Sequence, residues 1–137
     1  MDSIKVGYEN LIRSADSCFS NVIQLSSKSY LGYLWRARSL SILDPESLTD
    51  SAKIMYDKVY SMVQDTNEGN RYNKVIIECY RYFGSYYFFK SDREKKADPT
   101  LSASDKNTAK GYFEKILQID PADEQAKTVI LALNSNK

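Results

Sequence analysis

The residue types that most often perform chemistry are scarce in this sequence. Its 137 residues include no histidine, which excludes the commonest general base, the commonest zinc ligand and any Ser–His or Cys–His nucleophile pair. The two cysteines, Cys18 and Cys79, lie far apart in the chain. We interpret them as buried free thiols that pack as small apolar residues, with a single disulfide as the alternative. The sequence predicts no cofactor.

Acidic residues gather at Asp44, Glu46 and Asp50. This group lacks the ligand series and the glycine of an EF-hand calcium loop, so helix capping explains it better. We therefore predict no metal site. The sequence also offers no convergent set of carboxylates or lysines for an active site, and we expect a protein that is not an enzyme.

Charge and hydropathy limit the classes of partner. The 19 basic and 18 acidic residues leave a net charge of +1. Non-specific binding of a nucleic-acid backbone needs a concentrated positive field, which this balance does not provide. No stretch reaches the roughly 18–20 apolar residues of a membrane span. The start, Met1 to Ser3, lacks the basic and apolar regions of a signal peptide. This is consistent with a cytoplasmic protein if the chain is full length, and equally with a fragment whose targeting segment lies upstream.

Hydrophobic spacing predicts helices along the whole chain. Glycine (5) and proline (3) are scarce, and no segment of useful length alternates apolar and polar residues. Apolar residues at steps of three and four predict helices over residues 8–25, 30–43, 46–63, 72–90, 109–119 and 123–133. Polar turns separate these helices. The sequence therefore predicts an all-α fold.

Every second helix carries the same motif. A small residue is followed by an aromatic residue four positions later and by a β-branched residue three positions after that, as Ala15-Phe19-Val22, Ala52-Tyr56-Val59 and Ala109-Phe113-Ile116. The small residue lets a neighbouring helix approach, the aromatic ring fills the space between helix pairs, and the third residue faces the same core. Three occurrences predict an internal helical repeat.

This repeat resembles the tetratricopeptide repeat, a helix-turn-helix unit of 34 residues. Ala109, Phe113 and Pro121 match the second helix of the family pattern, and the segment 80–87 matches its first helix with aromatic replacements. In the preceding repeat Arg36 stands where the family has an apolar residue. The resemblance implies a right-handed superhelical stack of antiparallel helix hairpins with a C-terminal capping helix.

On this pattern the chain is a single helical-repeat domain over residues 1–137. It divides into a partial repeat over about 3–28, repeats over about 29–66 and 70–121, and a cap over 122–134. The motif residues within the full repeats lie farther apart than in the family, which predicts enlarged hairpin loops and an insertion at 91–108. Before its motif the first repeat has only a stub, roughly Ser3 to Glu9. This predicts an edge that either a cut chain exposes or a homodimer covers.

In tetratricopeptide proteins the first helices of successive repeats line a concave groove that holds extended peptides or partner helices. The resemblance therefore implies a protein or peptide partner bound by Leu34, Arg38, Ile42, Glu78, Arg81, Ser85, Phe88 and Phe89. Arginine and aromatic residues often dominate binding interfaces. For Phe88 and Phe89, packing beneath the insertion is an equal alternative. The Asn and Lys with which some family members clamp a C-terminal carboxylate are absent, so that specificity is not expected.

The leading hypothesis is a non-catalytic protein–protein interaction scaffold. Its alternative is a structural segment of a longer solenoid or a self-associating domain. A remote alternative is a binder of single-stranded nucleic acid, with the aromatic run 80–89 as a base-stacking platform. Core packing is the favoured interpretation of that run, because Tyr80, Phe83 and Tyr87 occupy internal positions of the family pattern.

Overall fold

A computed structural model describes residues 3–66 and 68–135 of the chain. The described residues form six α-helices and two short 3-10 segments, and no strand lies among them. The helices are α1 (Ser3–Leu25), α2 (Tyr30–Leu43), α3 (Ser51–Val63), α4 (Asn73–Glu94), α5 (Pro99–Ile119) and α6 (Glu124–Ser135). The predicted all-α class is confirmed. Met1 and Asp2 belong to the start that lacks signal-peptide features, and both lie outside the described residues. Asn67 of the predicted loop lies outside them as well.

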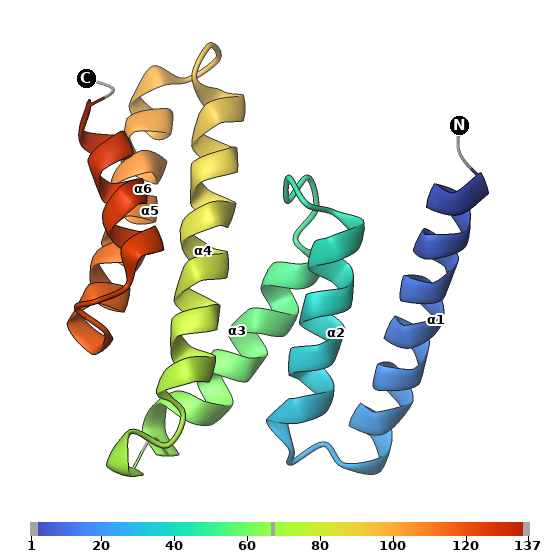
Figure 1. The fold of residues 1–137 in the computed structure, drawn as a ribbon. Helices are drawn as coiled ribbons and strands as arrows, with labels where there is room; N and C mark the ends of the chain where they lie inside the picture. Colours follow the sequence, from blue (N-terminus) through green and yellow to red (C-terminus); the bar gives the residue numbers. More distant parts are fainter. Residues whose placement is uncertain (1–2, 67, 136–137) are drawn as a thin grey trace. The chain divides into compact units, whose positions relative to one another are not determined.

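The chain divides into two compact units, Met1–Thr66 and Asn67–Lys137. In the first unit α1 packs against α2 and α2 against α3, and successive helices run in alternating directions (Figure 1). In the second unit α4 packs against α5 and α5 against α6. The division falls in the polar segment that separates the two full repeats of the sequence.

Local signals set the hairpin of α1 and α2. Ser29 is the N-cap of α2 and accepts a hydrogen bond from an amide of the first turn at 3.3 Å. Gly32 lets the helices approach closely, because a Cβ at this position would lie 2.9 Å from the Ile23 side chain. Arg36, which departs from the family pattern, pairs with Asp16 of α1, with 2.9 Å between Nε and Oδ1. An ion pair thus replaces the apolar contact expected there.

The turn between α2 and α3 is long, in line with the predicted enlargement. The Asp44 carboxylate organises it by accepting hydrogen bonds from the amides of Leu48 at 2.9 Å and Thr49 at 2.8 Å. Ser47 adopts a positive φ of 51° in the same turn. Helix α3 consequently begins at Ser51 and not at residue 46 as predicted.

Most of the segment 91–108 is helical, with a short turn over 95–98, which corrects the prediction of an enlarged loop at this place. Helix α4 continues to Glu94 and α5 already begins at Pro99. Asp98 caps α5 through a hydrogen bond from an amide of its first turn at 2.9 Å, and proline fits the first helical position because its missing N–H has no partner there in any helix. The longer spacing in the sequence reflects longer helices.

Polar side chains pack these added helical turns together. Ser91 and Ser102 are both buried, and the Ser102 hydroxyl donates a hydrogen bond to the Ser91 carbonyl at 2.7 Å. Lys90 pairs with Asp105, with 3.0 Å between Nζ and Oδ2. An apolar pattern is absent from this contact, which explains why hydrophobic spacing underestimates both helices.

Helix α1 also differs from the prediction at its start. The stub expected at Ser3 to Glu9 is not a separate element, because α1 runs unbroken from Ser3 to Leu25. Cys18 on this helix is exposed, which corrects the prediction of two buried thiols, whereas Cys79 on α4 is buried. Both cysteines are free.

The core of the second unit surrounds the Phe113 ring. Phe113 and Ile116 of α5 are buried together with Ala126 and Leu133 of α6. On the opposite side the ring lies against Gly84 of α4, where an added Cβ would meet it at 2.6 Å. Because position 84 has no side chain, α4 can approach α5 closely enough to enclose the ring.

We expect Gly84→Ala to destabilise the fold by about 1–3 kcal/mol, because the new methyl group overlaps the Phe113 ring. Gly111→Ala in α5 is the matched control. Nothing lies within 4 Å of a Cβ at position 111, so the better helix propensity of alanine should stabilise the fold by about 0.5–1 kcal/mol. Urea unfolding followed by circular dichroism measures both changes. Stabilisation by both substitutions would contradict the close approach of α4 and α5.

Candidate functional site

An apolar pocket of about 300 Å³ opens between α4 and α6. One wall comes from α4, where steps of three and four place Ser85, Phe88 and Phe89 on one side of the helix. The opposite wall comes from α6, and the Phe113 ring of α5 closes the base. The full lining consists of Ser85, Phe88, Phe89, Phe113, Thr128, Val129, Ala132 and Leu133.

Three of the eight predicted partner-binding residues meet in this pocket. They are Ser85, Phe88 and Phe89. The Phe88 side chain is 43% exposed, and its ring meets that of Phe89 edge to face with 5.7 Å between centroids. Packing beside the segment 91–108 remains the alternative for Phe88, because it lines a second hollow together with Ser102 and Lys106 of that segment.

The α6 wall is the part that the sequence pattern does not identify as a site. Val129 and Leu133 stand out only as the packing face of a capping helix, and Thr128 and Ala132 have no signal of their own. Val129 and Ala132 nevertheless line the pocket. The apolar residues of α6 cover more of the helix surface than one packing face needs. This broad apolar surface is the feature of the sequence that indicates a second contact surface on α6.

A more polar hollow continues from the apolar pocket. The two share Phe88 and Leu133. Among the described residues that line the second hollow, Lys95 and Lys106 outnumber the acidic Asp92. The apolar pocket therefore leads into a positively charged end, where a carboxylate would be favoured over an ammonium group.

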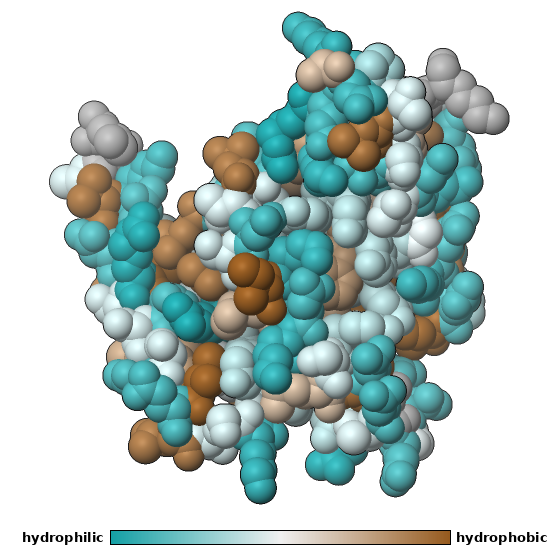
Figure 2. All heavy atoms as spheres, turned by 180° about the vertical axis from the view of Figure 1, so that it is seen from behind, coloured by the Kyte–Doolittle hydropathy of each residue, from teal (hydrophilic) through white to brown (hydrophobic). Residues whose placement is uncertain are grey.

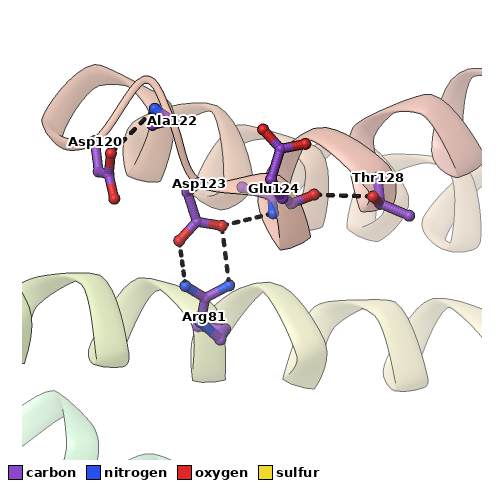
Figure 3. A network of polar contacts seen from close by, with 7 residues as sticks. Arg81, Asp120, Ala122, Asp123, Glu124 and Thr128 are labelled. Atoms are coloured by element: carbon purple, nitrogen blue, oxygen red, sulfur yellow. Dashed lines mark hydrogen bonds and ion pairs between the residues drawn. The ribbon is translucent and has the colours of Figure 1, made fainter.

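Arg81 is bound within its own unit, and its contact with a partner stays a prediction. Its guanidinium forms two hydrogen bonds with the Asp123 carboxylate, at 2.6 Å from Nη2 to Oδ2 and 3.4 Å from Nη1 to Oδ1 (Figure 3). Asp123 also caps α6 by accepting a hydrogen bond from the Ala126 amide at 2.8 Å. The pair fixes the start of α6 against α4 and so holds the two walls of the pocket together.

This contact changes the acidity of Asp123. The hydrogen bonds from Arg81 lower the pKa of its carboxyl below the ordinary 3.8, and the Ala126 amide acts in the same direction. Partial burial opposes the shift without cancelling it.

The predicted residues of the first unit lie along α2. Leu34 is 3% exposed and shares the buried face of the helix with Ala37, so its assignment to a partner surface is corrected. Arg38 lies over the Trp35 ring, with 4.5 Å between Cζ and the ring centroid. Ile42 is 47% exposed, and Trp35, which is not among the predicted binding residues, is 46% exposed. Steps of three and four place Trp35, Arg38 and Ile42 on one outer face of α2. This spacing could have identified Trp35 as part of the same surface.

The remaining predicted residue, Glu78, is half-buried on α4 and lines none of the hollows described above. Farther along this helix, the aromatic run turns inward. The rings of Tyr80, Phe83 and Tyr87 lie 5.9, 5.3 and 5.9 Å from that of Tyr112 on α5, measured between centroids. These rings join α4 to α5.

A charged cluster stands near the end of the α4–α5 hairpin. Lys90 lies between two carboxyl groups, 3.0 Å from Oδ2 of Asp105 and 3.9 Å from Oε1 of Glu94. Loss of hydration raises the pKa of Glu94, and its contact with Asp105 raises it further. The hydrogen bond to Asp105 raises the pKa of Lys90. Asp105 is only 6% exposed, and none of the three lines the apolar pocket.

Other kinds of site find no support within residues 3–66 and 68–135. No group of three or more Cys, Asp and Glu side chains in that part is arranged to hold a metal ion. None of the described helices is long and apolar enough to cross a membrane. No family model, curated protein or solved structure matches this chain.

We expect acid to weaken the fold through Asp123. Because its folded pKa lies below 3.8, the carboxylate stabilises the fold above that pH, and the contribution is lost as the pH falls through the lowered pKa. Asp123→Asn keeps a capping side chain and removes the charge, so it should cost about 1 kcal/mol near neutral pH.

Thermal unfolding of the parent and the variant, compared at about pH 6 and about pH 2, measures this contribution. The difference between the two proteins should shrink at the lower pH. Asp57→Asn on α3, whose carboxylate is 51% exposed and pairs with Lys53 of the same helix, controls for the loss of a negative charge from an exposed ion pair. An Asp123→Asn effect that stays the same at both pH values would contradict the ion pair.

Proposed function

We propose that this chain is a non-catalytic scaffold that binds a segment of another protein in the pocket between α4 and α6. The observation that carries the proposal is Phe88, a large aromatic side chain that stays 43% exposed at the mouth of a preformed apolar pocket. Covering such a side chain removes apolar surface from water, and aromatic residues are frequent anchors of binding interfaces. The finer fold assignment, a superhelical stack of tetratricopeptide-like hairpins, belongs to the same proposal and rests on the repeated motif.

The size and charge of the pocket define the segment that it would accept. A volume of about 300 Å³ lies at the lower end of ligand pockets and suits one or two large apolar side chains. Lys95 and Lys106 at the adjoining hollow favour acidic side chains next to that anchor. The ligand is therefore a peptide or helix in which a leucine or an aromatic residue is followed closely by aspartate or glutamate.

The pocket walls are ordered before any ligand arrives. The Arg81–Asp123 pair joins α4 to α6, and the contact between Gly84 and Phe113 positions α5 behind them. A preformed site loses less conformational freedom on binding, which increases affinity for a given contact area.

The other functions considered have less support. A base-stacking platform would need the faces of the aromatic run, but Tyr80, Phe83 and Tyr87 pack on Tyr112. The cluster of Lys90, Glu94 and Asp105 does not line the apolar pocket, and no titratable side chain stands among the residues that do. A structural segment of a longer solenoid is the alternative, since the first unit also exposes apolar residues on α1 and α2.

Selection from a random peptide display library on the immobilised chain tests the proposal. We expect enrichment of peptides with a large apolar residue and an acidic residue within one helical turn of it, and binding that weakens as salt is added. Failure to enrich any peptide, or enrichment of basic peptides, would overturn the proposed function.

Variants then locate the binding site. Phe88→Ala should weaken binding of a selected peptide by about tenfold or more, because it removes the exposed wall of the pocket. Leu101→Ala is the matched control, since Leu101 on α5 is 40% exposed and lines neither hollow. Lys95→Glu should selectively weaken the acidic peptides. Equal losses in the Phe88 and Leu101 variants, measured by fluorescence anisotropy, would exclude the pocket.

A further inference from the structure

Helix α1 is the least covered element of the first unit. It has 23 residues, and none of them is buried. The motif shared by α1, α3 and α5 allows burial to be compared at equivalent positions. Val59 on α3 and Ile116 on α5 are fully buried, whereas the equivalent Val22 on α1 is 42% exposed. Helix α5 packs against both α4 and α6, while α1 packs along one side against α2. The motif face that is buried on α3 and α5 is therefore only partly covered on α1, where Phe19 stacks on Trp35 of α2.

Seven residues of α1, all exposed except the half-buried Ala15, form a regular seam. Alternating steps of four and three, the spacing of a coiled coil, connect Ile4, Tyr8, Leu11, Ala15, Cys18, Val22 and Leu25. Leu25 is 88% exposed, Ile4 83%, Leu11 70% and Tyr8 53%. Figure 2 shows hydrophobic side chains recurring along the length of α1. Three heptads of this pattern favour a second helix as the cover for this seam.

The charges of α1 indicate which helix would cover it. None of the four charged residues of α1 lies on the seam or on the flank that faces away from α2. These residues are Lys5, Glu9, Arg13 and Asp16. That outer flank consists of small or uncharged polar residues, namely Ser3, Gly7, Asn10, Ser14, Ser17 and Asn21. A charged partner helix would lose hydration there without meeting an opposite charge. A second copy of α1 presents the same uncharged flank, so the two surfaces are electrostatically compatible.

The side-chain sizes indicate the direction of the second helix. When two copies run antiparallel about position 13, Leu11 faces Ala15, Tyr8 faces Cys18 and Ile4 faces Val22, and Leu25 lies beyond these three layers. Each larger side chain then meets a smaller one, as dense packing requires. In a parallel pair Tyr8 would face Tyr8 and Ala15 would face Ala15, which crowds one layer and leaves a gap in another.

We propose that two copies of this chain associate through an antiparallel pairing of their α1 helices along the seam. The interface is isologous, so each copy contributes the same residues. This inference uses a surface of the first unit and does not depend on the pocket between α4 and α6.

Sedimentation of the full chain over a range of concentrations tests the association. The parent protein should reach twice the mass of its 15.7 kDa chain, and Leu11→Glu should remain at the mass of one chain with unchanged helical circular dichroism. Ile54→Glu, at a position that is 57% exposed on α3, is the control and should still associate. A parent protein that stays monomeric, or association that survives Leu11→Glu, would overturn the proposal.

Cross-linking tests the direction. In a Tyr8→Cys variant, mild oxidation should join position 8 of one copy to Cys18 of the other. These positions lie about 15 Å apart within one helix, too far for a disulfide in the same chain. Peptide mapping identifies the bond. Predominant links between two copies of Cys18, which a parallel pair would form, would refute the antiparallel arrangement, and so would the absence of any link.

Discussion

The contact between the Phe113 ring and the backbone of Gly84 determines most of the second unit. It sets the distance at which α4 and α5 pack, because any side chain at position 84 would occupy the space of the ring. The same ring reaches across to Ala126 and Leu133 and so attaches α6 to the core. It also closes the base of the apolar pocket. The shape of the pocket is therefore a product of core packing and not of mobile surface loops.

The sequence predicts best those elements whose buried residues repeat at helical spacing. Ala109, Phe113 and Ile116 are recognisable from their spacing, and all three are buried. It fails where helices pack through polar side chains, as Ser91 does with Ser102, because hydrophobic periodicity is then absent. The cap at Asp98 with the following proline was a readable sign that a helix begins there and not a loop.

The candidate site was predictable in part. The face of α4 that carries Phe88 and Phe89 follows from helical spacing and from the position of this helix in the repeat. Spacing does not reveal which face of a helix has a neighbour, and for this reason Leu34 was misplaced. The role of Arg81 was not accessible either, because its partner Asp123 lies 42 positions away and comes close only after α6 has folded back.

The α4–α5 hairpin combines contacts between residues at very different distances along the chain. The bond between Ser91 and Ser102 closes a loop over 11 positions, whereas that between Arg81 and Asp123 closes one over 42. The loss of chain entropy on closing a loop grows with the logarithm of its length, and a closed inner loop shortens the free chain of the outer one. The polar contacts near the turn thus reduce the entropy that the distant ion pair must overcome, and they make attachment of α6 less costly than its position in the sequence suggests.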